Sequence, residues 1–119
     1  MLKTSDDLLN MQKNLLEKSL IIIKFTADWC GPCKKAKPII DENIKKLPES
    51  IKYNVIDIDD SIEVYGMLKA KRLVTSIPAL ICYNKDNNTL WPDEIVSTSN
   101  KEDIDKYLAI ISPFLLMLI

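Results

Sequence analysis

Two cysteines separated by two residues, Cys30 and Cys33, are the part of the sequence whose side chains and spacing could do chemistry. Two cysteines form a disulfide only when their Cα atoms lie within about 4.4–6.8 Å, a separation that the first turn of a helix provides. Gly31 and Pro32 suit that turn, because glycine allows the bend and proline is tolerated where a helix begins. The preceding residues 20–26 are apolar and rich in β-branched side chains, so we expect a strand, a reactive turn and then a helix.

A cysteine at the N-terminus of a helix has an electrostatic advantage as a nucleophile. The unpaired N–H groups and the positive end of the helix dipole favour a thiolate over a thiol. Cys30 is therefore the candidate nucleophile. Cys33 lies one turn further on, where we expect it to be less exposed and to act as the resolving thiol. Trp29 offers an apolar surface to a docking polypeptide.

Half of a zinc site is the main alternative for this pair of cysteines. A structural zinc ion takes four Cys or His ligands, but the chain has no histidine and only one further cysteine, Cys82. One monomer cannot complete such a site. The sequence therefore favours a redox dithiol that works without a metal or a bound cofactor.

The composition is that of a single globular domain of 119 residues, with 47% hydrophobic residues and a formal net charge of −1. The 16 basic residues are interleaved with 17 acidic ones, which argues against nucleic acid as a partner. The first seven residues lack the layout of a signal peptide, so we expect a reducing compartment and a cytoplasmic location.

The remaining pattern alternates helices and strands. An apolar tail follows the last expected helix, and it is far shorter than the roughly 20 residues that span a bilayer. We therefore expect the tail to pack on the domain. A contact with a partner or with a membrane is the alternative. The expected elements are a helix from Thr4 or Ser5 to near Ser19, a central strand over 20–25, a helix from the cysteines to Leu47 with Pro38 inside it, a strand over 51–58, a helix after Ser61, a strand opened by Pro78, an antiparallel return over 89–96, a helix from Asn100, and the tail at 113–119.

Two further groups of residues have both a structural and a chemical interpretation. Asp57, Asp59 and Asp60 resemble a metal cluster, but a turn with a helix cap explains them better, since no glycine-spaced calcium loop follows. Cys82 falls inside an apolar strand, which favours a small buried hydrophobic residue over a third redox thiol.

The order of these elements resembles the thioredoxin family over nearly the whole chain. Trp29-Cys30-Gly31-Pro32-Cys33 is similar to the active-site signature of that family, and Ile77-Pro78 resembles its cis-proline dipeptide. The resemblance implies an α/β, thioredoxin-like fold, with a central mixed sheet of four to five strands and helices on both faces. It also implies a thiol–disulfide oxidoreductase that reduces or exchanges protein disulfides.

The same resemblance implies roles for individual residues. Cys30 would attack the target disulfide and Cys33 would resolve the mixed disulfide. Pro78 would shape the substrate groove and keep metals off the thiols, and Ile77 would offer backbone hydrogen bonds to an extended segment. Trp29, Gly31 and Pro32 would border this groove. The implied partners are disulfide-containing proteins and an electron donor of the thioredoxin reductase type.

The sequence departs from the family pattern at positions that bear on the chemistry. Lys24 stands where the family usually has a buried aspartate, and Val55 where many members have a lysine. A protonated lysine cannot accept a proton from Cys33, so we expect slower resolution or proton transfer through water. A nearby cation also favours thiolates, which would make the dithiol more oxidising. Thr98 replaces a usual glycine and would narrow the groove.

These departures leave two alternatives to the expected disulfide reductase. One is a binding module of the thioredoxin fold in which the dithiol is idle. The other is a more oxidising disulfide oxidase or isomerase, which differs from a reductase in its reduction potential and would need an oxidising compartment.

Overall fold

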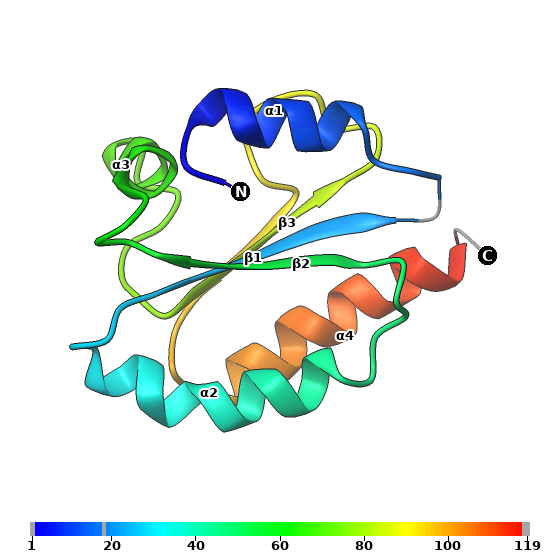
Figure 1. Cartoon of the computed structure of the whole chain (residues 1–119). Helices are drawn as coiled ribbons and strands as arrows, with labels where there is room; N and C mark the ends of the chain where they lie inside the picture. Colours follow the sequence, from blue (N-terminus) through cyan, green and yellow to red (C-terminus); the bar gives the residue numbers. More distant parts are fainter. Residues whose placement is uncertain (1, 18, 118–119) are drawn as a thin grey trace.

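A four-stranded mixed sheet forms the middle layer of the molecule, and helices cover both of its faces (Figure 1). The computed structural model describes residues 2–17 and 19–117, without the side chains of residues 62 and 112–117. The expected α/β architecture is confirmed. In chain order the elements are α1 Ser5–Lys13, β1 Leu20–Thr26, α2 Gly31–Ile44, β2 Lys52–Asp57, α3 Ile62–Ala70, β3 Ala79–Asn84, β4 Glu94–Ser97 and α4 Lys101–Met117.

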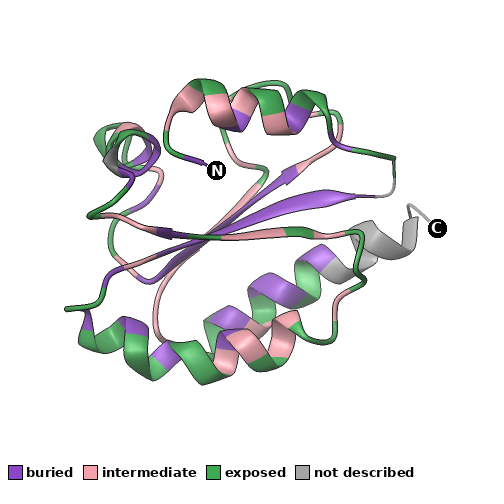
Figure 2. Cartoon of the chain, in the orientation of Figure 1, coloured by how far each residue is buried: buried purple, intermediate pink, exposed green. Residues whose placement is uncertain are grey.

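Strand β1 lies in the interior of the sheet, whose order is β2-β1-β3-β4. It pairs in parallel with β2 and antiparallel with β3, while β4 pairs antiparallel with β3. Residues 20–25 are buried on both faces, and Figure 2 shows β1 in the colour of buried residues along nearly its whole length. A run of apolar, β-branched residues suits such a position, because no side chain along it has to meet solvent.

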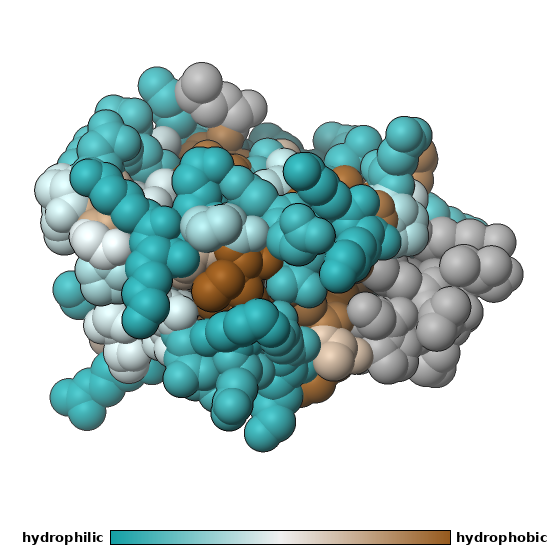
Figure 3. Space-filling view, turned by 90° about the horizontal axis from the view of Figure 1, so that it is seen from below, coloured by the Kyte–Doolittle hydropathy of each residue, from teal (hydrophilic) through white to brown (hydrophobic). Residues whose placement is uncertain are grey.

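The alternation of side chains along β1 divides the interior into two cores, one on each face of the sheet. Ile21, Ile23 and Phe25 pack on the side of α1 and α3. Leu20 and Ile22 pack on the other side, against the inner faces of α2 and α4. Seen from the side of α2 and α4, the surface is mainly hydrophilic around a small hydrophobic area (Figure 3). Helix α2 is therefore held against the sheet by apolar contacts and presents its polar face to solvent.

Helix α1 begins as expected but ends earlier. The Thr4 side chain accepts a hydrogen bond from the N–H of Asp7, whose carboxylate accepts one from the N–H of Thr4, and this capping box stabilises the first turn. The helix ends at Lys13 and not near Ser19, with Asn14 as its C-cap, and both the backbone N–H and the side-chain amide of Asn14 donate to the Asn10 carbonyl. Leu16, which lies beyond the end of the helix, is 71% exposed.

The segment after β2 forms a turn into α3, as the acidic cluster suggested. The N–H groups of Asp60 and Ser61 donate to the carbonyl of Asp57, and the Asp57 carboxylate accepts the N–H of Asp59 at 2.9 Å. Ser61 occupies the N-cap position of α3, but its side chain makes no capping hydrogen bond. The turn is therefore confirmed, while the expected side-chain cap is not formed.

Strand β4 is shorter than the expected return over residues 89–96. The side-chain amide of Asn87 donates to the Trp91 carbonyl at 2.7 Å and to the Asp93 carboxylate at 3.0 Å, which holds this segment as a loop. Pro92 has no N–H to contribute to a strand ladder. Pairing with β3 therefore begins only at Glu94.

Helix α4 begins as expected and runs further than expected. The Asn100 side chain accepts the N–H of Asp103, and Ile104, Tyr107, Leu108 and Ile111 are buried. The helix passes Pro113 and reaches Met117, where a separate tail was expected. Whether the tail packs on the domain lies outside the described residues, because neither the side chains of residues 112–117 nor residues 118–119 are described. Within the described part of the chain, no helix is long and apolar enough to cross a membrane.

Candidate functional site

A disulfide between Cys30 and Cys33 lies where β1 gives way to α2. Their Cα atoms are 5.2 Å apart, within the range that a disulfide requires. Ala27, Ile58 and Ile77 form a small apolar cluster around the two sulfur atoms. The strand, reactive turn and helix expected from the sequence are all present.

Cys30 occupies the N-cap position of α2, and its Sγ atom accepts the N–H of Cys33 at 3.1 Å. When the disulfide is reduced, this N–H and the positive end of the helix dipole are in place to stabilise a thiolate on Cys30. Gly31 is not needed for the bend, since it lies in the helix and an added Cβ would meet no atom within 4 Å. Pro32 lies in the first turn, as expected.

The two cysteines do not differ in burial as expected. Cys30 is 4% exposed and Cys33 is 5% exposed, so Cys33 is not the more buried of the pair. The reason is tertiary, because Ile58 and Ile77, from segments far away in the sequence, pack against the cluster that contains both cysteines. The Sγ atom of Cys30 lies 3.8 Å from the carbonyl oxygen of Ile77 in that segment.

The Ile77-Pro78 peptide bond is cis, as the sequence suggested. Its place beside the disulfide follows from the sheet, since antiparallel pairing puts the start of β3 next to the end of β1, with Ala79 opposite Phe25. Pro78 directly precedes Ala79. The structure thus brings Ile77 next to Cys30 although 47 residues separate them in the chain.

Trp29 is 66% exposed beside the disulfide, and its indole Nε1 donates to the carboxylate of Asp59 at 2.8 Å. Asp59 is held in turn by the hydrogen bond from its N–H to the Asp57 carboxylate. Sequence reasoning missed this role of Asp59. The available signal was the parallel pairing of β1 and β2, which places the segment after β2 beside the segment after β1.

Among the residues with described placement, no group of three or more His, Cys, Asp or Glu side chains could hold a metal ion.

Lys24 is buried near the middle of β1, and its side chain reaches toward α2. Its Nζ lies 4.0 Å from Oδ1 of Asp41, and Asp41 also pairs with the exposed Lys37 at 2.6 Å. Burial lowers the pKa of Lys24, and the negative charge of Asp41 opposes that shift. Asp41 lies eight residues after Cys33, about 12 Å along the helix axis. The ammonium group therefore points toward Asp41, a partner that the sequence did not reveal.

The other two departures from the family pattern also have defined positions. Val55 is the cross-strand neighbour of Lys24 on β2 and is 53% exposed, so no charged partner for Lys24 comes from that position. The hydroxyl of Thr98 accepts the N–H of Asn100 at 2.9 Å and helps to turn the chain from β4 into α4. Thr98 thus has a local structural role in addition to any effect on a groove.

Cys82 is a buried free thiol in β3, as expected. Burial raises its pKa to about 12, with smaller contributions from the charges of Asp93 and Glu94. A thiol with such a pKa is protonated at neutral pH and is therefore a poor nucleophile. The interpretation of Cys82 as a small core residue holds.

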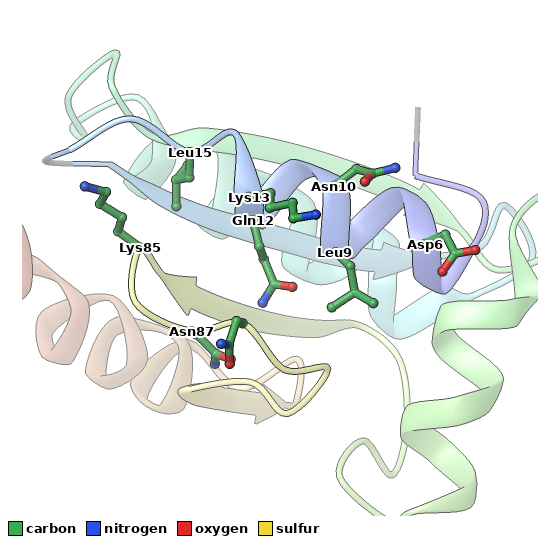
Figure 4. A pocket seen from close by; sticks show the side chains of 9 residues that line it. Asp6, Leu9, Asn10, Gln12, Lys13, Leu15, Lys85 and Asn87 are labelled. Carbon is green, nitrogen blue, oxygen red and sulfur yellow. The ribbon is translucent and has the colours of Figure 1, made fainter.

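A cavity of about 670 Å³ lies between α1 and the loop after β3 (Figure 4). Its lining residues come from residues 6–15 and 85–88 and include neither cysteine. Gln12 reaches into this region from α1 and donates to the Thr89 carbonyl at 2.8 Å, which ties the helix to the loop. The cavity and the dithiol are separate features of the molecule.

Comparison with known protein sequences gives a consistent result. A family model described as Thioredoxin matches residues 4–110. A thioredoxin of Listeria monocytogenes is 30% identical over 91 residues, which cover 76% of this chain and 82% of that protein. A thioredoxin of Bacillus subtilis is 33% identical over 82 residues, covering 69% and 68% of the two chains.

Solved structures show the same fold at lower sequence identity. The thioredoxin of Plasmodium falciparum superposes with a TM-score of 0.65 and 19% identity, covering 92% of this chain and 95% of that one. Oxidised mitochondrial thioredoxin 3 of Saccharomyces cerevisiae gives a TM-score of 0.65 and 21% identity, covering 92% of each chain.

Replacing Lys24 with methionine should stabilise the protein at pH 7 by about 1 kcal/mol or more, because it removes a buried charge but keeps the packing volume. The lowered pKa makes the native state lose its proton before the unfolded state, so wild-type stability rises as pH approaches the ordinary lysine value of 10.5. The gain from Lys24→Met should therefore shrink over that range. Urea unfolding at pH 7 and pH 10 measures both effects.

Lys35→Met, a change at an exposed position of α2, is the matched control and should change stability little at either pH. A Lys24→Met variant that is less stable than wild type at pH 7 would mean that the pairing with Asp41 outweighs the cost of burial.

Proposed function

Because the chain belongs to the thioredoxin family and is a thiol–disulfide oxidoreductase of the thioredoxin type, we propose that Cys30 and Cys33 are its reacting pair. The observation that carries the proposal is the bond between them at the N-terminus of α2. Two cysteines held at a Cα separation that suits a disulfide can pass two electrons to another disulfide by thiol–disulfide exchange.

The proposed reaction proceeds through two exchanges. The Cys30 thiolate attacks one sulfur of a substrate disulfide, forming a mixed disulfide and releasing the other substrate sulfur as a thiolate that takes up a proton. Cys33 then loses its proton and attacks the sulfur of Cys30. This step forms the Cys30–Cys33 disulfide and releases the second substrate thiol. The substrate gains two electrons and two protons, and a reductase restores the dithiol.

The substrate groove is proposed to lie between the exposed Trp29 and the cis-proline segment. Ile77 is half-buried, and its carbonyl lies near Cys30, so its backbone is suited to pair with an extended substrate segment as an added strand. Gly31 and Pro32 are exposed on the same side, at the start of α2. Thr98, after β4, is the residue proposed to narrow this groove.

Lys24 is proposed to modulate the dithiol through its charge. The buried Lys24 and the exposed Lys37 contribute two positive charges around Asp41, which contributes one negative charge, so this group of three carries a net charge of +1. A net positive charge favours the thiolates of the reduced form and so makes the protein more oxidising. Since Lys24 cannot accept a proton while it is charged, the proton of Cys33 is proposed to leave through water.

Proteins of this family act on disulfide substrates together with a reductase. The electron donor proposed here is of the thioredoxin reductase type. We place the reaction in the cytoplasm, since a dithiol that must be reduced after each turnover needs a reducing compartment. Disulfide reductase activity distinguishes this proposal from an idle dithiol. The reduction potential distinguishes it from a disulfide oxidase or isomerase.

Cys30→Ser should lower the reduction of insulin disulfides, coupled to thioredoxin reductase, to the uncatalysed rate, because serine cannot form the mixed disulfide. Cys33→Ser should still attack but should accumulate a mixed disulfide, visible by mass spectrometry. Cys82→Ala is the matched control and should keep wild-type activity. A wild-type protein that fails to reduce insulin would support the idle-dithiol alternative instead.

Lys24→Asp should raise the pKa of the Cys30 thiol and lower the reduction potential by tens of millivolts, where about 30 mV corresponds to 1.4 kcal/mol. Alkylation of Cys30 as a function of pH and redox titration against glutathione measure the two quantities. Lys35→Asp makes the same charge change at an exposed position of α2 and should have a smaller effect. If both quantities stay unchanged in Lys24→Asp, the charge of Lys24 does not reach the dithiol.

The apolar segment of residues 113–119 is proposed to give weak self-association. Removing residues 114–119 should change solubility or self-association, because it removes a run of apolar side chains, and should leave insulin reduction unchanged. Light scattering coupled to size exclusion, together with the insulin assay, checks both statements. Loss of insulin reduction in the shortened protein would contradict the assignment of the tail to association alone.

A further inference from the structure

An acidic cavity of about 540 Å³ lies at the end of the sheet where β1 leads into the dithiol. Because β1 and β2 are parallel, the residues that follow the two strands come together at this end. Asp28 follows β1, Asp57 ends β2 and Asp60 lies in the next turn. These three carboxylates and the ammonium group of Lys3 line the cavity, which gives it a formal net charge of −2.

Two of the three carboxylates are available to a ligand. Among the described residues, the side chains of Asp28 and Asp60 are exposed and take part in no ion pair. Asp57 differs, because its carboxylate already accepts the N–H of Asp59. Lys3 is exposed and has no ion-pair partner in that part of the chain either, so neither free carboxylate is neutralised by direct contact with it.

A buried hydroxyl group in the same cavity also lacks a partner. Ser61 lines the cavity and is only 8% exposed. It occupies the N-cap position of α3, yet its side chain makes neither a capping hydrogen bond nor any other hydrogen bond within the described residues. A buried polar group without a partner costs stability, and a ligand that donates a hydrogen bond to it removes that cost. Ser61 therefore adds a neutral acceptor to the two free carboxylates.

These acceptors suit a guanidinium group better than a metal ion. Among the residues with described placement, no three acidic side chains lie close enough together to hold a metal ion. A guanidinium group is planar and carries five N–H donors, so it can contact acceptors that are further apart. Its positive charge complements the negative charge of the cavity. The cavity volume falls within the range of about 300–1,000 Å³ of small-ligand sites, so an arginine side chain has room to enter.

The cavity adjoins the dithiol. Asp28 directly precedes Trp29, the exposed residue beside the disulfide, and the indole of Trp29 donates to Asp59 at 2.8 Å. Ile58, the residue after β2, packs against the cluster that contains both cysteines. A substrate bound at the dithiol can therefore reach the cavity with a side chain that lies near its own cysteine.

We propose that this cavity binds the guanidinium group of an arginine close to the reacting cysteine of the disulfide substrate. Asp28 and Asp60 pair with the positive charge, and Ser61 accepts one of the N–H groups. The cavity lies apart from the proposed groove beside the cis-proline segment and selects substrates by charge. This preference rests on the proposed function of Cys30 and Cys33 and adds a substrate class to it.

Disulfide-exchange kinetics of the reduced full-length protein test the preference. Each substrate is a peptide with one cysteine, linked as a disulfide to β-mercaptoethanol, and arginine, citrulline or glutamate occupies each position near the cysteine in turn. Citrulline has nearly the shape of arginine without its charge. At the best position, the arginine peptide should react about fivefold faster than the citrulline peptide, and the glutamate peptide should react more slowly than both. The difference should shrink in about 1 M salt, which screens charges beyond about 3 Å.

Charge removal tests whether the cavity carries this preference. Asp28→Asn combined with Asp60→Asn should bring the ratio of the arginine and citrulline rate constants close to one, because it removes both free carboxylates. Glu49→Gln combined with Asp86→Asn is the matched control and should leave the ratio unchanged. These two exposed residues lie before β2 and after β3, at the opposite end of the sheet. Circular dichroism confirms that both variants fold.

Binding to the oxidised protein provides a readout that needs no reaction. N-acetylarginine amide should shift the backbone NMR signals of residues 54–61, and N-acetylcitrulline amide should not, because it lacks the charge. Lys3→Gln should enlarge these shifts at a given concentration, since it removes a positive charge that opposes the ligand. Ser61→Ala should reduce them, since one acceptor is lost.

Several outcomes overturn this assignment. Equal rate constants for the arginine and citrulline peptides show that the cavity does not select by charge, although the proposed function stands if both peptides are reduced. A preference that survives in the variant with Asp28→Asn and Asp60→Asn, or that the control variant loses equally, places its origin outside the cavity. Failure to reduce any of the peptides contradicts the proposed function instead. In that case NMR signals of residues 54–61 that do not shift with N-acetylarginine amide overturn the binding site itself.

Discussion

The pairing of β1 with strands on both of its sides is the constraint on which the rest of the structure depends. Because β1 is buried on both faces and held in register with β3, its last residues emerge at one defined place beside the start of β3. Helix α2 begins directly after β1, so Cys30 becomes the N-cap of a helix. The cis-proline segment directly precedes β3, so Ile77 comes to lie beside the same sulfur atom. A shift of one residue in this register would turn every side chain of β1 to the other face and separate the two parts of the site.

Lys24, whose side chain reaches toward α2, lowers the folding stability and is proposed to change the redox equilibrium of the dithiol. Burial of the Lys24 ammonium costs stability, and the pairing with Asp41 offsets part of that cost. The same positive charge is proposed to favour thiolates in the reduced protein, which would be an effect on the redox equilibrium and not on folding. Under that proposal Asp41 has two roles, since it stabilises the Lys24 ammonium and partly neutralises its charge.

The end of strand β2 also supports the functional site. The turn after β2 positions Asp59, which holds the indole of Trp29 beside the disulfide. Asp57, the last residue of β2, closes that turn through its carbonyl and its carboxylate, so the end of β2 supports Trp29.

Local patterns in the sequence predicted the parts of this protein that depend on near neighbours in the chain. The spacing of Cys30 and Cys33, the cap at Thr4, the buried run over residues 20–25 and the proline before β3 act over a few residues, and each was recognised before its tertiary surroundings were known. The resemblance to the thioredoxin family added the order of the elements and the pairing of the two site motifs.

Only the tertiary structure decided which distant side chains meet. Asp41 as the partner of Lys24, Asp59 as the partner of Trp29 and the equal burial of the two cysteines all depend on how strands and helices pack. The short β4 reflects side-chain hydrogen bonds that compete with regular structure, and a periodic pattern does not record that competition. Hydrophobic periodicity states which face of an element is buried, whereas contacts between residues far apart in sequence are set by the geometry of the assembled sheet.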